Sequence, residues 1–201
     1  MEIEKSEKVL AMYHAVWQLL SEGKNLEKLK VSDITECAGI GKGTAYEYFR
    51  SKEEIVTKAL QYNCLMQVQI LVDRAMKEKC FRKSLEACFD WIAENHDRFQ
   101  MVFQIMKKAG AVVKNSDDLC GQEENCIGSA ALWKLTGYII QLGRKEKLIR
   151  ENLSDYLASV QILSQLLGFF ACQELLPCKE KEDMTMTKAF LCDNIIKSLS
   201  C

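Results

Sequence analysis

Apolar residues recur along this chain at the three- and four-residue spacing of amphipathic helices, and no stretch alternates with the two-residue period of a strand. A single proline and ten glycines leave few interruptions. We therefore predict an all-α fold of about nine helices. Two are short helices within 31–49, and the others span roughly 4–22, 52–79, 82–95, 98–109, 123–147, 154–176 and 184–199.

Residues 31–59, VSDITECAGIGKGTAYEYFRSKEEIVTKA, indicate two short helices around a tight turn, followed directly by a third helix. Val31, Ile34 and Ala38 share one face of the first short helix. Gly39 follows at a position where a helix C-terminal turn needs a positive φ. This arrangement is typical of a DNA-binding helix-turn-helix.

The second short helix has two different faces. Ala45 and Phe49 are four residues apart and share the buried face. Lys42 and Tyr46 have the same spacing and share another face, which is left for contacts outside the domain.

The stretch DITECAGIGKGTAYEYFRSKEEI resembles the operator-binding motif of the tetracycline-repressor-like (TetR) family of transcriptional regulators. The match includes the GKGTxYxYF core of the recognition helix and the Ser-Lys-Glu-Glu start of the next helix. The resemblance implies a three-helix DNA-binding domain over 1–58 and a helical effector-binding and dimerisation domain over 59–201.

The resemblance also implies which residues contact DNA. In this reading Lys42 contacts guanine acceptors or a phosphate, the tyrosines contact the sugar-phosphate backbone, and Lys52 contributes to a phosphate site. Packing is the alternative for Tyr48, and Ser51 with Glu54 forms an S-x-x-E capping box that needs no function. The assigned positions are Lys30, Ser32, Lys42, Gly43, Thr44, Tyr46, Glu47, Tyr48 and Lys52.

Three positions depart from the family pattern. Gly41 replaces the serine that usually caps the recognition helix, and Lys30 replaces a capping threonine. Glu47 puts an acid on the exposed face, where it would repel phosphates, accept from a cytosine amino group, or simply be solvated. The chain is nearly neutral, with 27 basic and 28 acidic residues, so we expect weak non-specific binding and a strong dependence on the correct site.

The segment 154–176 is apolar over more than one helical stripe, so it must bury two sides. The family resemblance implies a homodimer whose last two helices form a four-helix interface. A pseudo-palindromic operator with half-sites about 34 Å apart would match that symmetry. The interface residues expected are Leu157, Val160, Leu163, Leu167, Phe170, Phe190 and Ile195.

Aromatic and methionine side chains of the middle helices suggest an apolar or amphipathic small-molecule effector. The alternative is that these are ordinary core residues. The candidates for the pocket are Trp91, His96, Phe99, Phe103, Trp133 and Tyr138.

Ten cysteines are scattered without the spacing of a zinc site, and in a reducing cytosol they most simply act as small buried hydrophobes. The rival hypothesis is a thiol-based redox or metal sensor that uses Cys120 with Cys126, or Cys172 with Cys178. A third is a helical partner-binding module without DNA affinity. We expect no enzyme activity, catalytic residue, metal or cofactor, because no nucleophile, acid-base pair or phosphate loop is evident.

No run of about 18 apolar residues and no apolar signal segment is apparent, so we expect a cytoplasmic protein without a membrane span.

Overall fold

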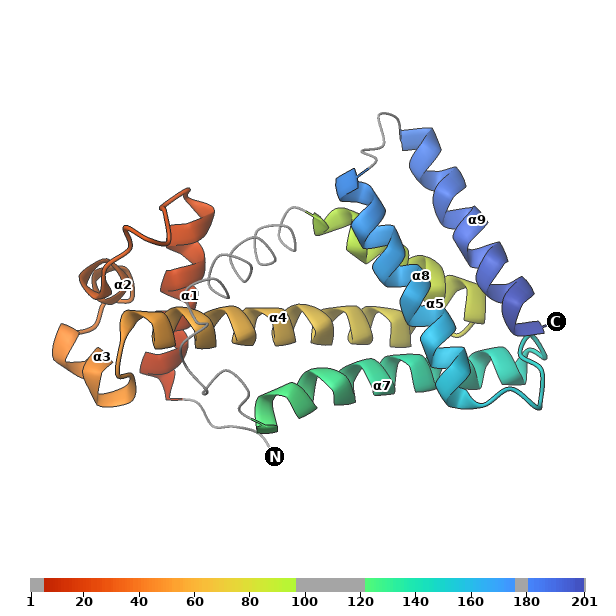
Figure 1. Ribbon diagram of the computed structural model, residues 1–201, viewed down its shortest axis with the longest axis horizontal. Coiled ribbons are helices and arrows are strands. Elements are labelled where there is room, and N and C mark those ends of the chain that lie inside the picture. The colour runs from red at the N-terminus through yellow and green to blue at the C-terminus, as the bar shows by residue number, and fades with distance from the viewer. Residues whose placement is uncertain (1–5, 97–121, 176–180, 201) are drawn as a thin grey trace. The chain divides into compact units, whose positions relative to one another are not determined.

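The computed structural model describes residues 6–96, 122–175 and 181–200, and within 122–129, 174–175 and 181–183 it describes the backbone alone. These residues form helices and no strand, which confirms the all-α prediction (Figure 1). The predicted helix over 98–109 lies outside the described residues. The helices are α1 (Glu7–Ser21), α2 (Val31–Cys37), α3 (Lys42–Tyr48), α4 (Lys52–Lys77), α5 (Phe81–Glu94), α7 (Gln122–Lys145), α8 (Asp155–Leu175) and α9 (Lys181–Ser200).

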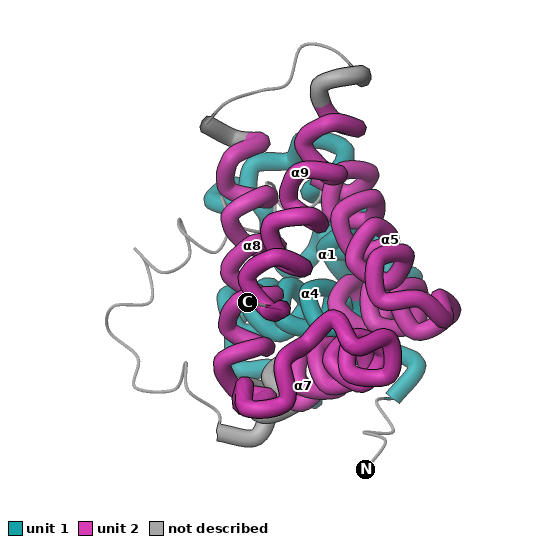
Figure 2. Tube along the Cα trace, turned by 90° about the vertical axis from the view of Figure 1, so that its right-hand side faces the viewer, with its two compact units in different colours: residues 1–66, 101–119 teal, residues 67–100, 120–201 magenta. Residues whose placement is uncertain are grey.

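The helices belong to two compact units (Figure 2). Described residues up to Met66 form unit 1, and those from Gln67 onward form unit 2. The division lies inside α4, whereas the sequence suggested a domain boundary after residue 58.

Unit 1 encloses a core between α1, α2, α3 and the first turns of α4. The ring of Tyr13 lies 6.0 Å from that of Phe49 and 5.4 Å from that of Tyr62. Burial of this apolar surface holds the short helices α2 and α3 in place, since helices of seven residues are not stable alone. Its most deeply buried members include Met12, Val16, Ile34, Ala45, Ile55 and Ala59.

Unit 2 has a second core, formed by the end of α4 with α5, α7, α8 and α9. The rings of Phe89 and Phe169 meet edge to face with their centroids 5.1 Å apart. Helices α8 and α9 lie side by side. Fully buried side chains of this core include Phe81, Leu85, Leu135, Ile139, Ile162 and Ile195.

Polar contacts fix the helices of unit 2 in register. Lys188 pairs with Asp90, and Arg82 pairs with Asp193, so two ion pairs join α9 to α5. All four side chains are partly exposed, so these pairs set helix orientation more than they add stability.

The first turn of α5 is capped by a side chain that is distant in the sequence. Cys80 occupies the N-cap position but makes no side-chain cap bond. Instead the carboxylate of Glu146, just after α7, accepts a 2.8 Å hydrogen bond from the backbone N–H of Phe81. One of the orphan donors at the helix start is thereby satisfied, and α7 is tied to α5.

By length and composition alone, α8 is apolar enough to cross a membrane. Its mean hydropathy over Asp155–Gln173 is 1.2. Among the described helices it is the only one that is both long and apolar enough to span a membrane. Helices of ordinary globular proteins meet the same criterion. The more informative fact is that 28% of this stretch is buried inside the protomer, which leaves much apolar surface exposed.

Candidate nucleic-acid interface

The turn between α2 and α3 has the geometry that its glycine predicts. Gly39 has a φ of 68°, which confirms the expectation of a left-handed residue at the end of α2. The N–H of Ile40 donates to the carbonyl of Thr35 over 2.9 Å, and the Ile40 side chain packs against the core of unit 1. Because the chain reverses so tightly, α3 begins only a few residues after α2 ends.

The two capping positions that depart from the family pattern are stabilised in different ways. The backbone N–H of Lys30 donates to the carboxylate of Asp33 over 3.0 Å, which supplies half of a capping box at the start of α2. Gly41, in contrast, adopts the extended conformation of an N-cap without any side-chain bond.

The faces of α3 divide as the sequence predicts. Ala45 is fully buried and Phe49 is 4% exposed, so this side of α3 packs into unit 1. Lys42, Gly43 and Glu47 are exposed on the other side. Tyr46 joins them with 52% of its surface exposed, whereas Thr44 is half-buried.

Gly43 lies in open space. A Cβ atom added there would meet no heavy atom within 4 Å outside its own helix backbone, so nothing in unit 1 requires glycine at this position. The absence of a side chain instead leaves the backbone of α3 open to approach from outside.

Tyr48 has features of both roles considered for it, a contact with DNA and packing within the domain. It is 41% exposed, and its hydroxyl oxygen accepts a 3.3 Å hydrogen bond from the hydroxyl of Ser6. The contact joins the end of α3 to the residue before α1. Ser32, on α2, is exposed.

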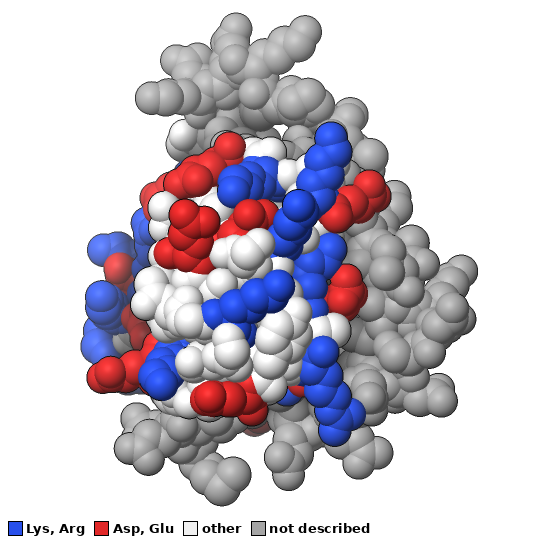
Figure 3. Space-filling view, turned by 90° about the vertical axis from the view of Figure 1, so that its left-hand side faces the viewer, with Lys and Arg blue, Asp and Glu red and all other residues white. Residues whose placement is uncertain are grey.

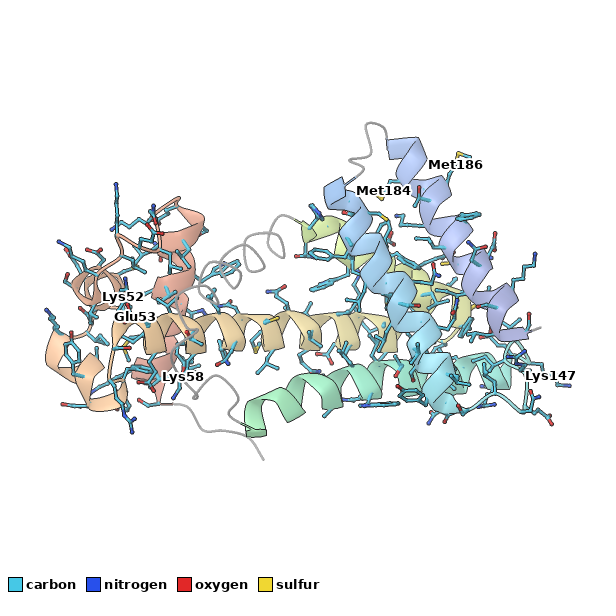
Figure 4. All side chains as sticks on the ribbon, viewed as in Figure 1. Lys52, Glu53, Lys58, Lys147, Met184 and Met186 are labelled. Atoms are coloured by element: carbon cyan, nitrogen blue, oxygen red, sulfur yellow. The ribbon has the colours of Figure 1, made fainter. Side chains whose placement is uncertain are left out.

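Lys52 is directed toward its own unit (Figure 4). Its ammonium lies 3.5 Å from the carbonyl oxygens of Leu26 and Glu27, and 3.5 Å from the carboxylate of Glu53. Only 24% of its side chain is exposed. A purely phosphate-binding role therefore does not describe this lysine, because its charge also holds α4 against the segment before α2.

The predicted capping box at the start of α4 forms in a modified way. The hydroxyl of Ser51 accepts from the N–H of Glu54 over 3.1 Å, as expected. The carboxylate of Glu54 accepts from the N–H of Arg50 over 2.7 Å, one residue earlier than in the standard box. This hydrogen bond, helped by the hydrogen bond and positive charge of Lys58, outweighs desolvation and lowers the pKa of Glu54 below its ordinary value of 4.5.

The surface around α2 and α3 has no single sign of charge. Lysines and arginines are interspersed with aspartates and glutamates on the face shown in Figure 3. This agrees with the near-neutral balance of residues 1–58, which contain nine basic and ten acidic side chains.

The candidate effector residues do not gather in one described pocket. Trp91 is 3% exposed within the core of unit 2, and the Tyr138 hydroxyl donates to the carbonyl of Glu78 over 2.6 Å. The His96 ring lies 5.7 Å from that of Phe170, and Trp133 is on the surface with 52% exposed. Phe99 and Phe103 lie outside the described residues.

Most of the expected interface residues are exposed. Leu157, Val160, Leu167 and Phe190 range from 47% to 67% exposed, while Leu163 and Phe170 are half-buried. The prediction for Ile195 is wrong, because this side chain is fully buried in the core of its own subunit.

One exposed residue of this surface, Tyr156, was not expected from the sequence. Tyr156 is 63% exposed, four residues before Val160. Met186, which the apolar pattern of the last helix places on the same partner surface as Phe190, is 72% exposed. Figure 4 shows Met186 on the outer side of α9, with Met184 toward α8. The four-residue spacing to predicted interface residues was the signal available in the sequence.

The described cysteines are free thiols in contrasting environments. Cys88 and Cys192 are buried, and desolvation raises the pKa of each to about 12. Cys37 and Cys172 are exposed. Cys120 and Cys178, one member of each hypothetical sensor pair, lie outside the described residues.

A short turn between two helices, with the second helix presented outward on a shared core, defines a helix-turn-helix DNA-binding protein. Residues 17–59 match the model of the bacterial regulatory proteins of the tetR family. This N-terminal domain is therefore that of the TetR-family transcriptional regulators. A search of curated proteins found no match.

Solved structures of regulators share the fold over nearly the whole chain. The fatty acid degradation regulator FadR of Bacillus halodurans is 18% identical, with 98% of each chain covered and a TM-score of 0.58. FadR of Bacillus subtilis in complex with stearoyl-CoA is 17% identical over 93% of this chain and 97% of that one, with a TM-score of 0.60. SmeT, the repressor of the Stenotrophomonas maltophilia multidrug efflux pump SmeDEF, is 13% identical over 96% and 92%, with a TM-score of 0.56.

Proposed function

We propose that this regulator is a homodimeric repressor that binds a pseudo-palindromic operator and is released by a small apolar or amphipathic effector. The observation that carries the proposal is the outward face of α3, where Lys42, Gly43, Tyr46 and Glu47 are exposed opposite the buried Ala45. An α-helix presented in this way fits the major groove of B-DNA, in which each base pair has its own donor and acceptor pattern. We propose a cytoplasmic location, where an operator is accessible.

The exposed side chains of α3 divide by the contacts that they are able to make. Lys42 lies in the first turn and is suited to a guanine or a phosphate, and the hydroxyl of Tyr46 is suited to the sugar-phosphate backbone. Glu47 carries an acid that phosphates repel, so a productive contact would be with a cytosine amino group. Because the DNA-binding residues 1–58 carry no net positive charge, DNA binding would depend on these specific contacts.

The surface of α8 supports the homodimer. From Tyr156 to Gln173 this helix has no charged residue, although most of the stretch is not buried in the protomer. The exposed side chains of Leu157, Val160 and Leu167 form an apolar surface on α8, and covering this surface with another protein surface would be favourable. A two-fold symmetric pairing would cover both copies of the face and present two α3 helices to a palindrome.

A solved relative and the path of α4 support the effector class. The relative from Bacillus subtilis holds stearoyl-CoA, an amphipathic molecule, and this chain has a similar fold. Helix α4 begins in unit 1 and ends in unit 2, so it links the DNA-binding residues to the helical unit. An effector would shift operator binding only by its difference in affinity for the two states.

Selection of bound sites from random duplex DNA tests the proposal, together with sedimentation of the purified protein. We expect enrichment of a palindrome with half-sites about 34 Å apart and a dimer in solution. If no palindrome is enriched although the protein is folded, a partner-binding module becomes the better assignment. Glu47→Gln should change the base preference at one position of each half-site without reducing the affinity for unrelated DNA.

A further inference from the structure

An aromatic groove opens on the surface of unit 2 between α7 and α8. The rings of Trp133 and Tyr156 form one wall, with their centroids 6.3 Å apart and their planes tilted by 33°. Trp133 is 52% exposed and Tyr156 is 63% exposed. The groove is lined by Leu132, Trp133, Tyr156, Ser159, Val160 and Leu163.

The floor of the groove offers little to a polar ligand. Ser159 contributes the hydroxyl there, but this group is buried and donates a 3.0 Å hydrogen bond to the hydroxyl oxygen of Thr136. The Thr136 hydroxyl in turn donates to the carbonyl of Leu132 over 3.1 Å. The polar groups therefore satisfy one another, and the remaining lining is apolar or aromatic.

The groove continues into the uncharged face of α8. Tyr156, Val160, Leu163 and Leu167 are spaced by four, three and four residues, so they form one stripe along the helix. The first three of these line the groove, and Leu167 extends the stripe by one further turn. The groove is thus one edge of a longer apolar surface.

We propose that a second copy of this chain covers the groove and that Trp133 is an anchor residue of the dimer interface, not an effector contact. This inference rests on the homodimer proposed above and extends its surface from α8 and α9 onto α7. A small molecule in the groove would leave Leu167 of this stripe in water, whereas a second subunit would cover the whole stripe. Buried tryptophans are frequent energetic centres of such interfaces.

Sedimentation of the full chain over a dilution series tests the proposal. Trp133→Ala should raise the dimer dissociation constant by about tenfold or more, as the loss of a central aromatic does. Trp133→Phe should restore most of the affinity. Ile70→Ala is the matched control, because Ile70 is 45% exposed on α4 of the same unit and should leave the constant unchanged.

Tryptophan fluorescence supplies an independent readout. Dimer formation should shift the wild-type emission to shorter wavelength and reduce quenching by acrylamide, and this change should disappear in Trp133→Phe. Circular dichroism confirms that each variant is folded, and Tyr156→Ala provides a second variant of the same groove.

The outcomes distinguish this inference from the proposed function. A dimeric wild type whose dissociation constant is unaffected by Trp133→Ala and Tyr156→Ala overturns the inference and leaves the homodimer intact. A wild type that stays monomeric at all concentrations overturns both. The inference is also wrong if anilinonaphthalene sulfonate binds the dimer stoichiometrically and Trp133→Ala abolishes this binding without changing the dimer dissociation constant. The groove would then be a ligand site.

Discussion

The ammonium of Lys52 lies 3.5 Å from the main-chain oxygen of Leu26, so the start of α4 is joined to the segment before α2. The same cation is the one that family resemblance assigns to a DNA phosphate. Carbonyl oxygens and a phosphate both attract a positive charge, so Lys52 can serve the fold, DNA binding or both. Measuring stability and DNA binding on one variant distinguishes these roles.

Lys52→Ala should weaken binding to all DNA sequences alike and reduce the slope of log affinity against log salt by about 1, because one phosphate contact is lost. Lys42→Ala should also relax the sequence preference. Both are checked by equilibrium binding over a salt series on operator and unrelated DNA. Lys145→Ala, which removes an exposed lysine from unit 2, should leave the slope unchanged.

The thermal unfolding of Lys52→Ala tells the two roles of this lysine apart. A lower melting temperature with an unaltered salt slope would mean that Lys52 serves the fold alone, and the phosphate assignment would then be discarded.

Gly143→Ala should destabilise the protein by about 1–3 kcal/mol through overpacking. An added Cβ would lie 2.7 Å from Cδ1 of Ile149 and 2.8 Å from Cδ2 of Phe81, and both side chains are buried. Gly137→Ala on the same helix is the control. There the new methyl group meets nothing within 4 Å, so higher helix propensity should stabilise by about 0.5–1 kcal/mol. Urea unfolding of the two variants should therefore shift in opposite directions, and equal shifts would contradict the packing described here.

The thiols should react in the order set by their burial. Cys37 and Cys172 are exposed and should be labelled by iodoacetamide in the native protein at pH 8. Cys88 and Cys192 should be protected until unfolding, because burial raises the pKa of each to about 12. Peptide mass mapping after short labelling measures this.

The same labelled protein tests the thiol-sensor alternative. Unchanged operator affinity after mild oxidation of the reactive thiols would remove that hypothesis, whereas a loss of affinity that is reversed by a reductant and prevented by Cys172→Ser would support it.

Glu54 should contribute to acid sensitivity. Its pKa is lowered in the folded state, first by the hydrogen bond from the N–H of Arg50, so its contribution is fully present above its ordinary pKa of 4.5. The contribution is lost as pH falls through the lower folded pKa. Glu54→Gln should consequently reduce stability at pH 7 and flatten the decline of stability below pH 4.5.

Urea unfolding of the wild type and Glu54→Gln between pH 7 and pH 3 provides the measurement. Glu36→Gln, which alters an exposed glutamate on α2, is the control and should follow the wild type. Parallel curves for all three proteins would show that the Arg50 contact has no effect on folding.

Local chemistry made part of the fold predictable. The tight turn at Gly39 follows from a residue that tolerates positive φ, and the buried Ala45 follows from its four-residue spacing to Phe49. The start of α4 follows from the capping chemistry of Ser51 and Glu54, although the carboxylate bonds the N–H of Arg50 instead of that of Ser51.

The helices and the exposed face of α3 are predictable from the amino-acid sequence, because spacing, glycine and capping act within a few residues of each other. Which apolar side chains of α5, α7, α8 and α9 are buried depends instead on how these helices pack. This packing buries Ile195 and Trp91 in the subunit core, and it leaves Trp133 and Leu167 on the surface. Periodicity identifies a helix face as apolar, but it does not say whether that face packs in its own subunit or against another molecule.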